Sequence, residues 1–101
     1  MQKRRSAGFL GVILLALLPM ARAAAADPSY QPGMDLPSFD YRNFDLPRPR
    51  PRFCQEACLA DQRCKAWTFV RMGTLGPLAS CWLKSQVPEA RPDPCCVSGV
   101  R

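Results

Sequence analysis

The 101-residue sequence contains no histidine, the side chain that most often serves as a general acid or base and as a metal ligand. It also has no phosphate-binding glycine loop and no Gly-x-Ser-x-Gly nucleophile elbow. The acidic residues outside the N-terminal region are scattered, and no two of them stand out as an acid and base pair. We therefore expect a protein that is not an enzyme and that uses no cofactor.

The sequence also lacks a Cys-x-x-Cys pair, which argues against a zinc knuckle and against a thioredoxin-like redox site. It nevertheless has six cysteines, at positions 54, 58, 64, 81, 95 and 96. In a short chain that cannot build a large core, six cysteines predict a disulfide framework in an oxidising compartment. We expect no metal site.

No apolar run is long enough to span a membrane, which takes about 20 residues. The longest, Ala7–Leu18, has twelve residues, follows a basic start and precedes the small residues Ala21–Ala26. This order predicts a signal peptide over residues 1–26, with cleavage after Ala23 or as late as after Ala26. Arg4 and Arg5 also permit a twin-arginine export route. We expect a secreted or periplasmic protein with no stable membrane anchor after cleavage.

Little net charge remains once this leader is set aside. The formal charge of the whole chain is +6, but four basic residues and no acids lie in residues 1–26, so the rest carries +2. A general affinity for polyanions loses most of its support, and we expect no nucleic-acid partner. Arginines in the alternating segment Pro47–Arg52 could hold an anionic group, although a solvated extended connector explains this segment better.

The first half of the remaining chain predicts one strand and one helix. Residues 27–37 are rich in proline and should form an irregular lead-in, so we place the domain at residues 38–101. Residues 38–46 should form a strand with a bulge near Arg42 and Asn43, where the apolar alternation slips. A helix should begin near Pro51 and end near Ala60 or Asp61.

The second half predicts a hairpin and a last short strand. Strands are expected over 64–71 and 79–85, joined by a loop over 72–78, and residues 87–94 should be a loop before a strand over 95–100. Alternation counted from Cys64 puts Ala66, Thr68 and Val70 on the same face of the strand as Cys64. Trp67 and Phe69 would then lie on the opposite face.

Six cysteines allow fifteen pairings, and sequence alone does not select one. Spacing favours Cys58 with Cys64, across a tight turn, and Cys54 with Cys81, from the helix start to the second hairpin strand. The loop-entropy model gives these bonds about 2–2.5 and about 3.5 kcal/mol. For Cys95 and Cys96 a vicinal disulfide, two thiols and bonds to another chain all remain open.

Five segments resemble the PAN/Apple domain family in its short bacterial secreted form. They are Ser38–Leu46, Cys54–Cys58, Cys64–Val70, Cys81–Lys84 and Cys95–Val100. The resemblance implies an α+β fold, with one helix on a curved antiparallel sheet of four to five strands, and the same pairs, Cys54 with Cys81 and Cys58 with Cys64. It also implies a non-catalytic module that binds a protein or a carbohydrate. The third bridge of Apple domains has no counterpart here, because no cysteine precedes the helix.

If Cys64 and Cys81 face the helix, aromatic and basic side chains share the other face of the sheet and could bind a sugar or an anionic group. These candidate binding residues are Lys65, Trp67, Phe69, Arg71, Trp82 and Lys84. Alternatively, Phe39, Tyr41 or the proline-rich segments cover this face as a second small core.

Two other interpretations stay open. The protein could be a secreted inhibitor or a partner subunit of a larger extracytoplasmic complex, docking through the loop over 72–78 or through a sheet edge. Cys95 and Cys96 could have a thiol-active role.

Overall fold

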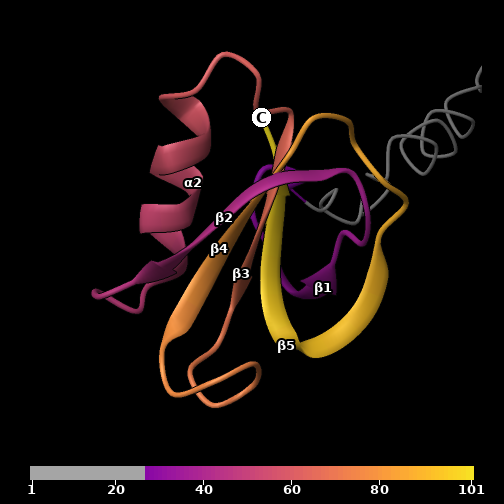
Figure 1. The fold of residues 1–101 in the computed structure, drawn as a ribbon. Helices are drawn as coiled ribbons and strands as arrows, with labels where there is room; N and C mark the ends of the chain where they lie inside the picture. Colours follow the sequence, from indigo (N-terminus) through magenta and orange to yellow (C-terminus); the bar gives the residue numbers. More distant parts are fainter. Residues whose placement is uncertain (1–26) are drawn as a thin grey trace, which may run out of the picture.

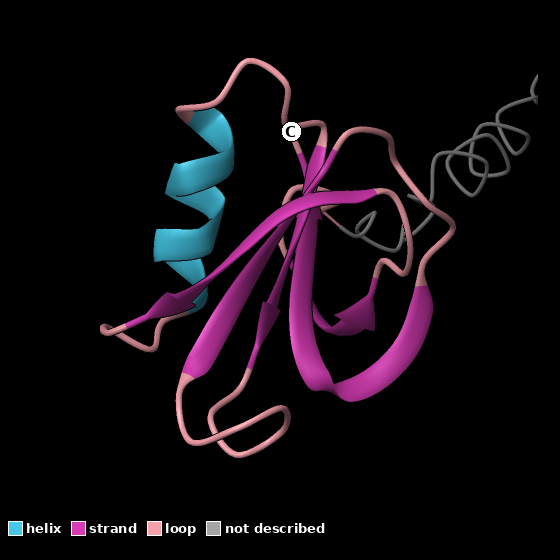
Figure 2. Cartoon of the chain, in the orientation of Figure 1, coloured by secondary structure: helices cyan, strands magenta, loops and turns pink. Residues whose placement is uncertain are grey.

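The computed structural model describes residues 27–101, and the predicted signal peptide lies outside the described residues. The elements in chain order are β1 (Gln31–Asp35), β2 (Asp40–Leu46), α2 (Pro51–Leu59), β3 (Ala66–Val70), β4 (Ala79–Lys84) and β5 (Arg91–Val100). The five strands form one antiparallel sheet in the order β1-β5-β3-β4-β2, and β5 curves strongly along its length (Figure 1). The helix packs on one face of this sheet, so the predicted α+β class is confirmed (Figure 2).

Helix α2 is held to the sheet by the cysteines on its buried face. Pro51 occupies the first turn, where its missing N–H would have had no intrahelical partner. Cys54 and Cys58 follow one turn apart and are fully buried. Cys54 is bonded to Cys81 of β4, and Cys58 to Cys64 just before β3, the pairs that spacing favours. A nine-residue helix is marginal alone, so these bonds and its packing account for its stability.

The predicted face of β3 is wrong. The strand register pairs Trp67 with Leu83 and Phe69 with Cys81, and directly paired residues lie on the same face of a sheet. Trp67 and Phe69 are therefore on the helix side, where they are 1% and 4% exposed. The strand begins only at Ala66, after a bend at Lys65, so the alternation cannot be counted from Cys64.

The N-terminal and C-terminal segments contribute more strand than the sequence predicts. The expected irregular lead-in over 27–37 contains β1, which pairs along one edge of β5. The expected loop over 87–94 is strand from Arg91 onward. In β2 the register shifts between Asp40 and Arg42, close to the predicted bulge.

The core on the helix side is centred on Trp67. Its indole lies against Gly99 of β5, where an added Cβ would be 2.7 Å from two indole carbons and would overlap the Ser29 carbonyl oxygen. Tyr30 packs near the same ring, with its centroid 6.0 Å away. Position 99 therefore requires glycine.

Among residues 27–101, no helix is both long and apolar enough to cross a membrane.

Candidate functional site

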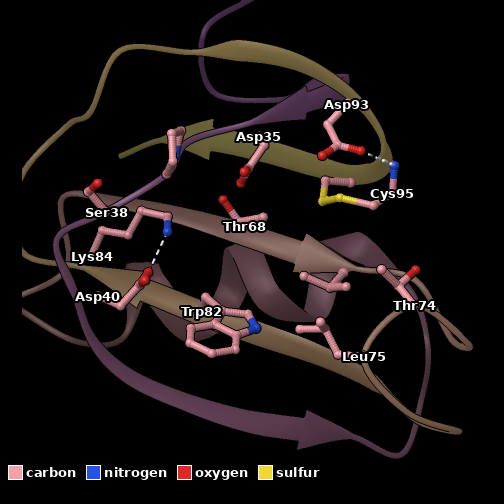
Figure 3. Close-up of a pocket in the computed structure, with 13 residues that line it drawn as sticks. Asp35, Ser38, Asp40, Thr68, Thr74, Leu75, Trp82, Lys84, Asp93 and Cys95 are labelled. Carbon is pink, nitrogen blue, oxygen red and sulfur yellow. Dashed lines mark hydrogen bonds and ion pairs between the residues drawn. A yellow bond between two sulfur atoms is a disulfide. The ribbon is translucent and has the colours of Figure 1, made fainter.

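The sheet face opposite α2 is hollowed into a cavity of about 430 Å³ (Figure 3). Thr68 and Val70 of β3 form its floor, between Trp82 and Lys84 of β4 and Cys96 of β5. We call this cavity the sheet pocket. Its remaining lining residues are Asp35, Pro37, Ser38, Asp40, Thr74, Leu75, Asp93 and Cys95.

Trp82 presents its ring to the sheet pocket in a fixed orientation. Its indole N–H donates a hydrogen bond to the Ser80 hydroxyl, 3.0 Å away on the same strand. The side chain is half-buried, and Figure 3 shows the ring lying along one side of the pocket. With its polar atom satisfied, the ring face is available for stacking on a flat ligand surface.

Lys84 lies beside Trp82 and forms an ion pair with Asp40 of the edge strand β2. The Lys84 side chain is 3% exposed, whereas the Asp40 side chain is 33% exposed. A buried ammonium needs a partner, and Asp40 is the carboxylate that supplies it. The pair fixes two charged groups at one end of the pocket.

A directed hydrogen-bond chain supports the pocket floor. The Leu36 amide donates to the Thr68 hydroxyl at 3.4 Å, and the Ser98 hydroxyl donates to the Met34 carbonyl at 2.8 Å. The Thr68 and Ser98 hydroxyls are 2.7 Å apart. Since Ser98 uses its proton on Met34, Thr68 is the donor in this last bond. These hydrogen bonds connect β3, β5 and the end of β1 on the pocket side of the sheet.

The pocket is rich in carboxylates. Asp35, Asp40 and Asp93 line it, and Lys84 is the one cation among its lining residues. The Cys95 amide donates to the Asp93 carboxylate at 3.0 Å, which holds that side chain over Cys95 (Figure 3). The excess of carboxylate favours a neutral hydroxyl-bearing ligand, or a cationic one, over an anionic ligand.

The chain turns from β1 to β2 at the pocket rim through a strained backbone. Ser38 and Phe39 have φ values of 83° and 63°, in the left-handed region that non-glycine residues rarely adopt. Ser38 lines the sheet pocket, and Phe39 is 46% exposed. Strain of this kind occurs often at ligand-binding sites, where surrounding structure holds it.

The structure brings together only two of the six predicted binding residues. Trp82 and Lys84 line the sheet pocket, while Trp67 and Phe69 are in the core on the other side of the sheet. Lys65 and Arg71 are exposed outside the pocket, and the Arg71 Nε donates to the Pro94 carbonyl at 2.9 Å.

The three pocket carboxylates and Thr68 on the pocket floor are not among the residues that the sequence predicts for the site. Thr68 lies beside Trp82 because of the register of β3 on β4, which the sequence pattern alone does not give. The carboxylates come from three separate segments, so no local pattern indicates them.

The third disulfide lies at the edge of the sheet pocket, between Cys95 and Cys96. It is the vicinal bond among the alternatives that the sequence left open. Cys95 is half-buried and Cys96 is 2% exposed.

A family model described as PAN domain matches residues 34–84, about half of the chain. The matched segment runs from the end of β1 through β4, so it includes α2 and the residues Trp82 and Lys84. No curated protein and no solved structure matches the chain significantly.

Proposed function

Because the chain belongs to the PAN domain family, whose members typically bind proteins or carbohydrates, we propose that it is a non-catalytic module whose sheet pocket binds an uncharged carbohydrate unit. The observation that carries this proposal is the Trp82 ring, held by its hydrogen bond to Ser80 in a pocket that carboxylates and a lysine also line. Sugars present an apolar ring face and several hydroxyls, and the pocket offers a partner for each.

The size and charge of the pocket support this ligand class. A volume of about 430 Å³ lies within the range of small-molecule sites, about 300–1,000 Å³. Asp35, Asp93 and the exposed part of Asp40 can accept hydrogen bonds from sugar hydroxyls. An acidic sugar would meet three carboxylates against one lysine, so neutral sugars are favoured.

The test is a glycan array followed by calorimetry with the purified protein and the glycans that bind. Trp82→Ala should abolish binding while the melting temperature stays close to wild type, because this ring is half-buried on the pocket side. Lys65→Ala is the matched control, since Lys65 is exposed outside the pocket and should not affect affinity. Full binding by Trp82→Ala, or no glycan bound at all, would reject the proposal.

A second candidate function is docking of a protein partner through the β3–β4 loop. Met72, Leu75 and Leu78 in this loop are 58%, 66% and 49% exposed, and exposed apolar clusters are typical of interaction sites. This corresponds to an inhibitor or a partner subunit. Stoichiometric capture of one protein that is lost when the three residues are changed to serine, with Trp82→Ala unaffected, would favour this function.

We also propose that the protein acts outside the cytoplasm, in the periplasm or after secretion. The support is the presence of three disulfides within residues 27–101, a density typical of oxidising compartments. Cell fractionation with an antibody to the protein tests this location.

A further inference from the structure

The three disulfides differ in how far a reductant can reach them. Cys54, Cys58, Cys64 and Cys81 are all fully buried, and their two bonds link α2 to the sheet side of the core. The Cys95–Cys96 bond instead lies at the open sheet pocket, and Cys95 is half-buried. Thiol–disulfide exchange requires direct access to a sulfur atom, so the vicinal bond should be reduced first.

Opening this bond should leave the fold intact. A disulfide stabilises mainly by closing a loop of the unfolded chain, and a bond between adjacent residues closes almost none. The segment around it is anchored independently. The Arg71 amide donates to the Cys95 carbonyl at 3.0 Å, and the pairing of Cys96 with Val70 continues the sheet.

The opened pair would place two thiols beside a carboxylate. The two sulfur atoms and an Asp93 carboxylate oxygen all lie within 4.8 Å of one another. The hydrogen bond from the Cys95 amide to the Asp93 carboxylate uses neither sulfur atom, so opening the disulfide does not itself remove it. Three donors at this spacing can converge on one ion.

We infer that Cys95 and Cys96, once reduced, form with Asp93 a site for a thiophilic divalent metal ion such as Zn²⁺ or Cd²⁺. Thiolates select soft and borderline ions, and a carboxylate is a common third ligand for zinc. Hard ions such as Mg²⁺ and Ca²⁺ prefer all-oxygen sites and should not compete. The open side of the pocket leaves the fourth position to solvent.

The redox step needs a dithiol reductant, which donates two electrons and two protons. Its thiolate attacks the Cys95 sulfur and forms a mixed disulfide, while Cys96 leaves as a thiolate and takes up a proton. The second thiol of the reductant then attacks the mixed disulfide, releases Cys95 as a thiol and closes the reductant into its own disulfide. Metal binding displaces one proton from each thiol, so affinity should rise with pH.

The experiment has two stages on the purified protein. Limited treatment with a dithiol, followed by alkylation and intact mass, should show two free thiols per chain while circular dichroism stays unchanged. Cd²⁺ is then titrated into a reduced, unalkylated sample, with its thiolate-to-metal charge-transfer absorbance as the signal. A ratio of one Cd²⁺ per chain, with no response to Mg²⁺, is the expected result.

Variants separate this site from unspecific thiol binding. Asp93→Asn keeps an oxygen that can accept the hydrogen bond from the Cys95 amide. It should still lower the affinity for Cd²⁺, by no less than the roughly 10–100-fold that loss of an outer-shell partner costs. Glu56→Gln, an exposed site on the helix side of the sheet, should bind as wild type. Cys95→Ser with Cys96→Ser should fold and give no absorbance.

Two results would overturn the inference. One is the appearance of four or more thiols together with loss of structure before any two-thiol species, since the vicinal bond would then not open selectively. The other is equal Cd²⁺ affinity in wild type and Asp93→Asn, which would exclude the carboxylate as a ligand. Neither result depends on whether the pocket binds a carbohydrate.

Discussion

The ion pair between Lys84 and Asp40 should respond very differently to loss of one partner or the other. Lys84 is almost entirely buried, whereas a third of the Asp40 side chain is exposed. Asp40→Asn removes the charge that offsets a buried ammonium, and breaking a buried pair in this way costs about 3–5 kcal/mol. We expect about 3 kcal/mol, a large part of the roughly 5–15 kcal/mol that stabilises small domains.

Lys84→Met should cost much less, because the carboxylate left behind can be hydrated through its exposed part. The loss should resemble that of an exposed pair, about 1 kcal/mol or below. Methionine also keeps most of the buried chain length of lysine. The double variant should be close to Lys84→Met alone, since no buried charge remains in it.

Urea denaturation followed by circular dichroism measures both losses of stability. The slope of the free energy of unfolding against urea concentration should stay unchanged. The predicted order of stability is wild type, then Lys84→Met together with the double variant, then Asp40→Asn. If Lys84→Met proves as destabilising as Asp40→Asn, or more so, the argument from unequal burial is wrong.

Three further changes test other parts of the structure. Gly99→Ala should lower the melting temperature and expose Trp67 to fluorescence quenchers, because the added Cβ overlaps the indole. Thr68→Val should cost about 1–3 kcal/mol in urea denaturation by leaving buried polar groups without partners. Hydrogen bonds from Arg63 hold the pKa of Asp61 well below its usual range. Ionised Asp61 therefore stabilises the folded protein, fully above the unfolded pKa of about 4 and progressively less as the pH falls below that value. Asp61→Asn should accordingly flatten the acid side of the curve of stability against pH.

The helix and the second hairpin strand could be predicted because their signals are local. Cys54 and Cys58 repeat at the helical period after a proline suited to the first turn, and β4 alternates cleanly around Cys81. For β3 the alternation predicts the wrong face. Cys64 is bonded to Cys58 of the helix, but it lies before the strand begins at Ala66, so its direction does not carry over to the strand residues. A bend of one residue reverses every side chain that follows.

The strands β1 and the first part of β5 could not be predicted because prolines and a glycine obscure them. Pro32 and Gly33 lie on the edge strand β1, which has no neighbour on its outer side. A proline without an N–H is tolerated on such an edge. Pro92 lies in the part of β5 that pairs with β1 only, before the pairing with β3 begins at Cys96. The pocket depends on these strands, and the sequence therefore indicated Trp82 and Lys84 without their acidic neighbours.

The most direct test of the proposed pocket uses the two tryptophans of the chain as separate reporters. Trp67→Phe leaves Trp82 as the only emitter, and Trp82→Phe leaves Trp67, so each variant reports on one face of the sheet. Titration with the glycan that binds best on the array should change the fluorescence of the Trp67→Phe variant, saturating with the calorimetric affinity. The Trp82→Phe variant should show no change. A response confined to Trp67, on the helix side, would contradict the account.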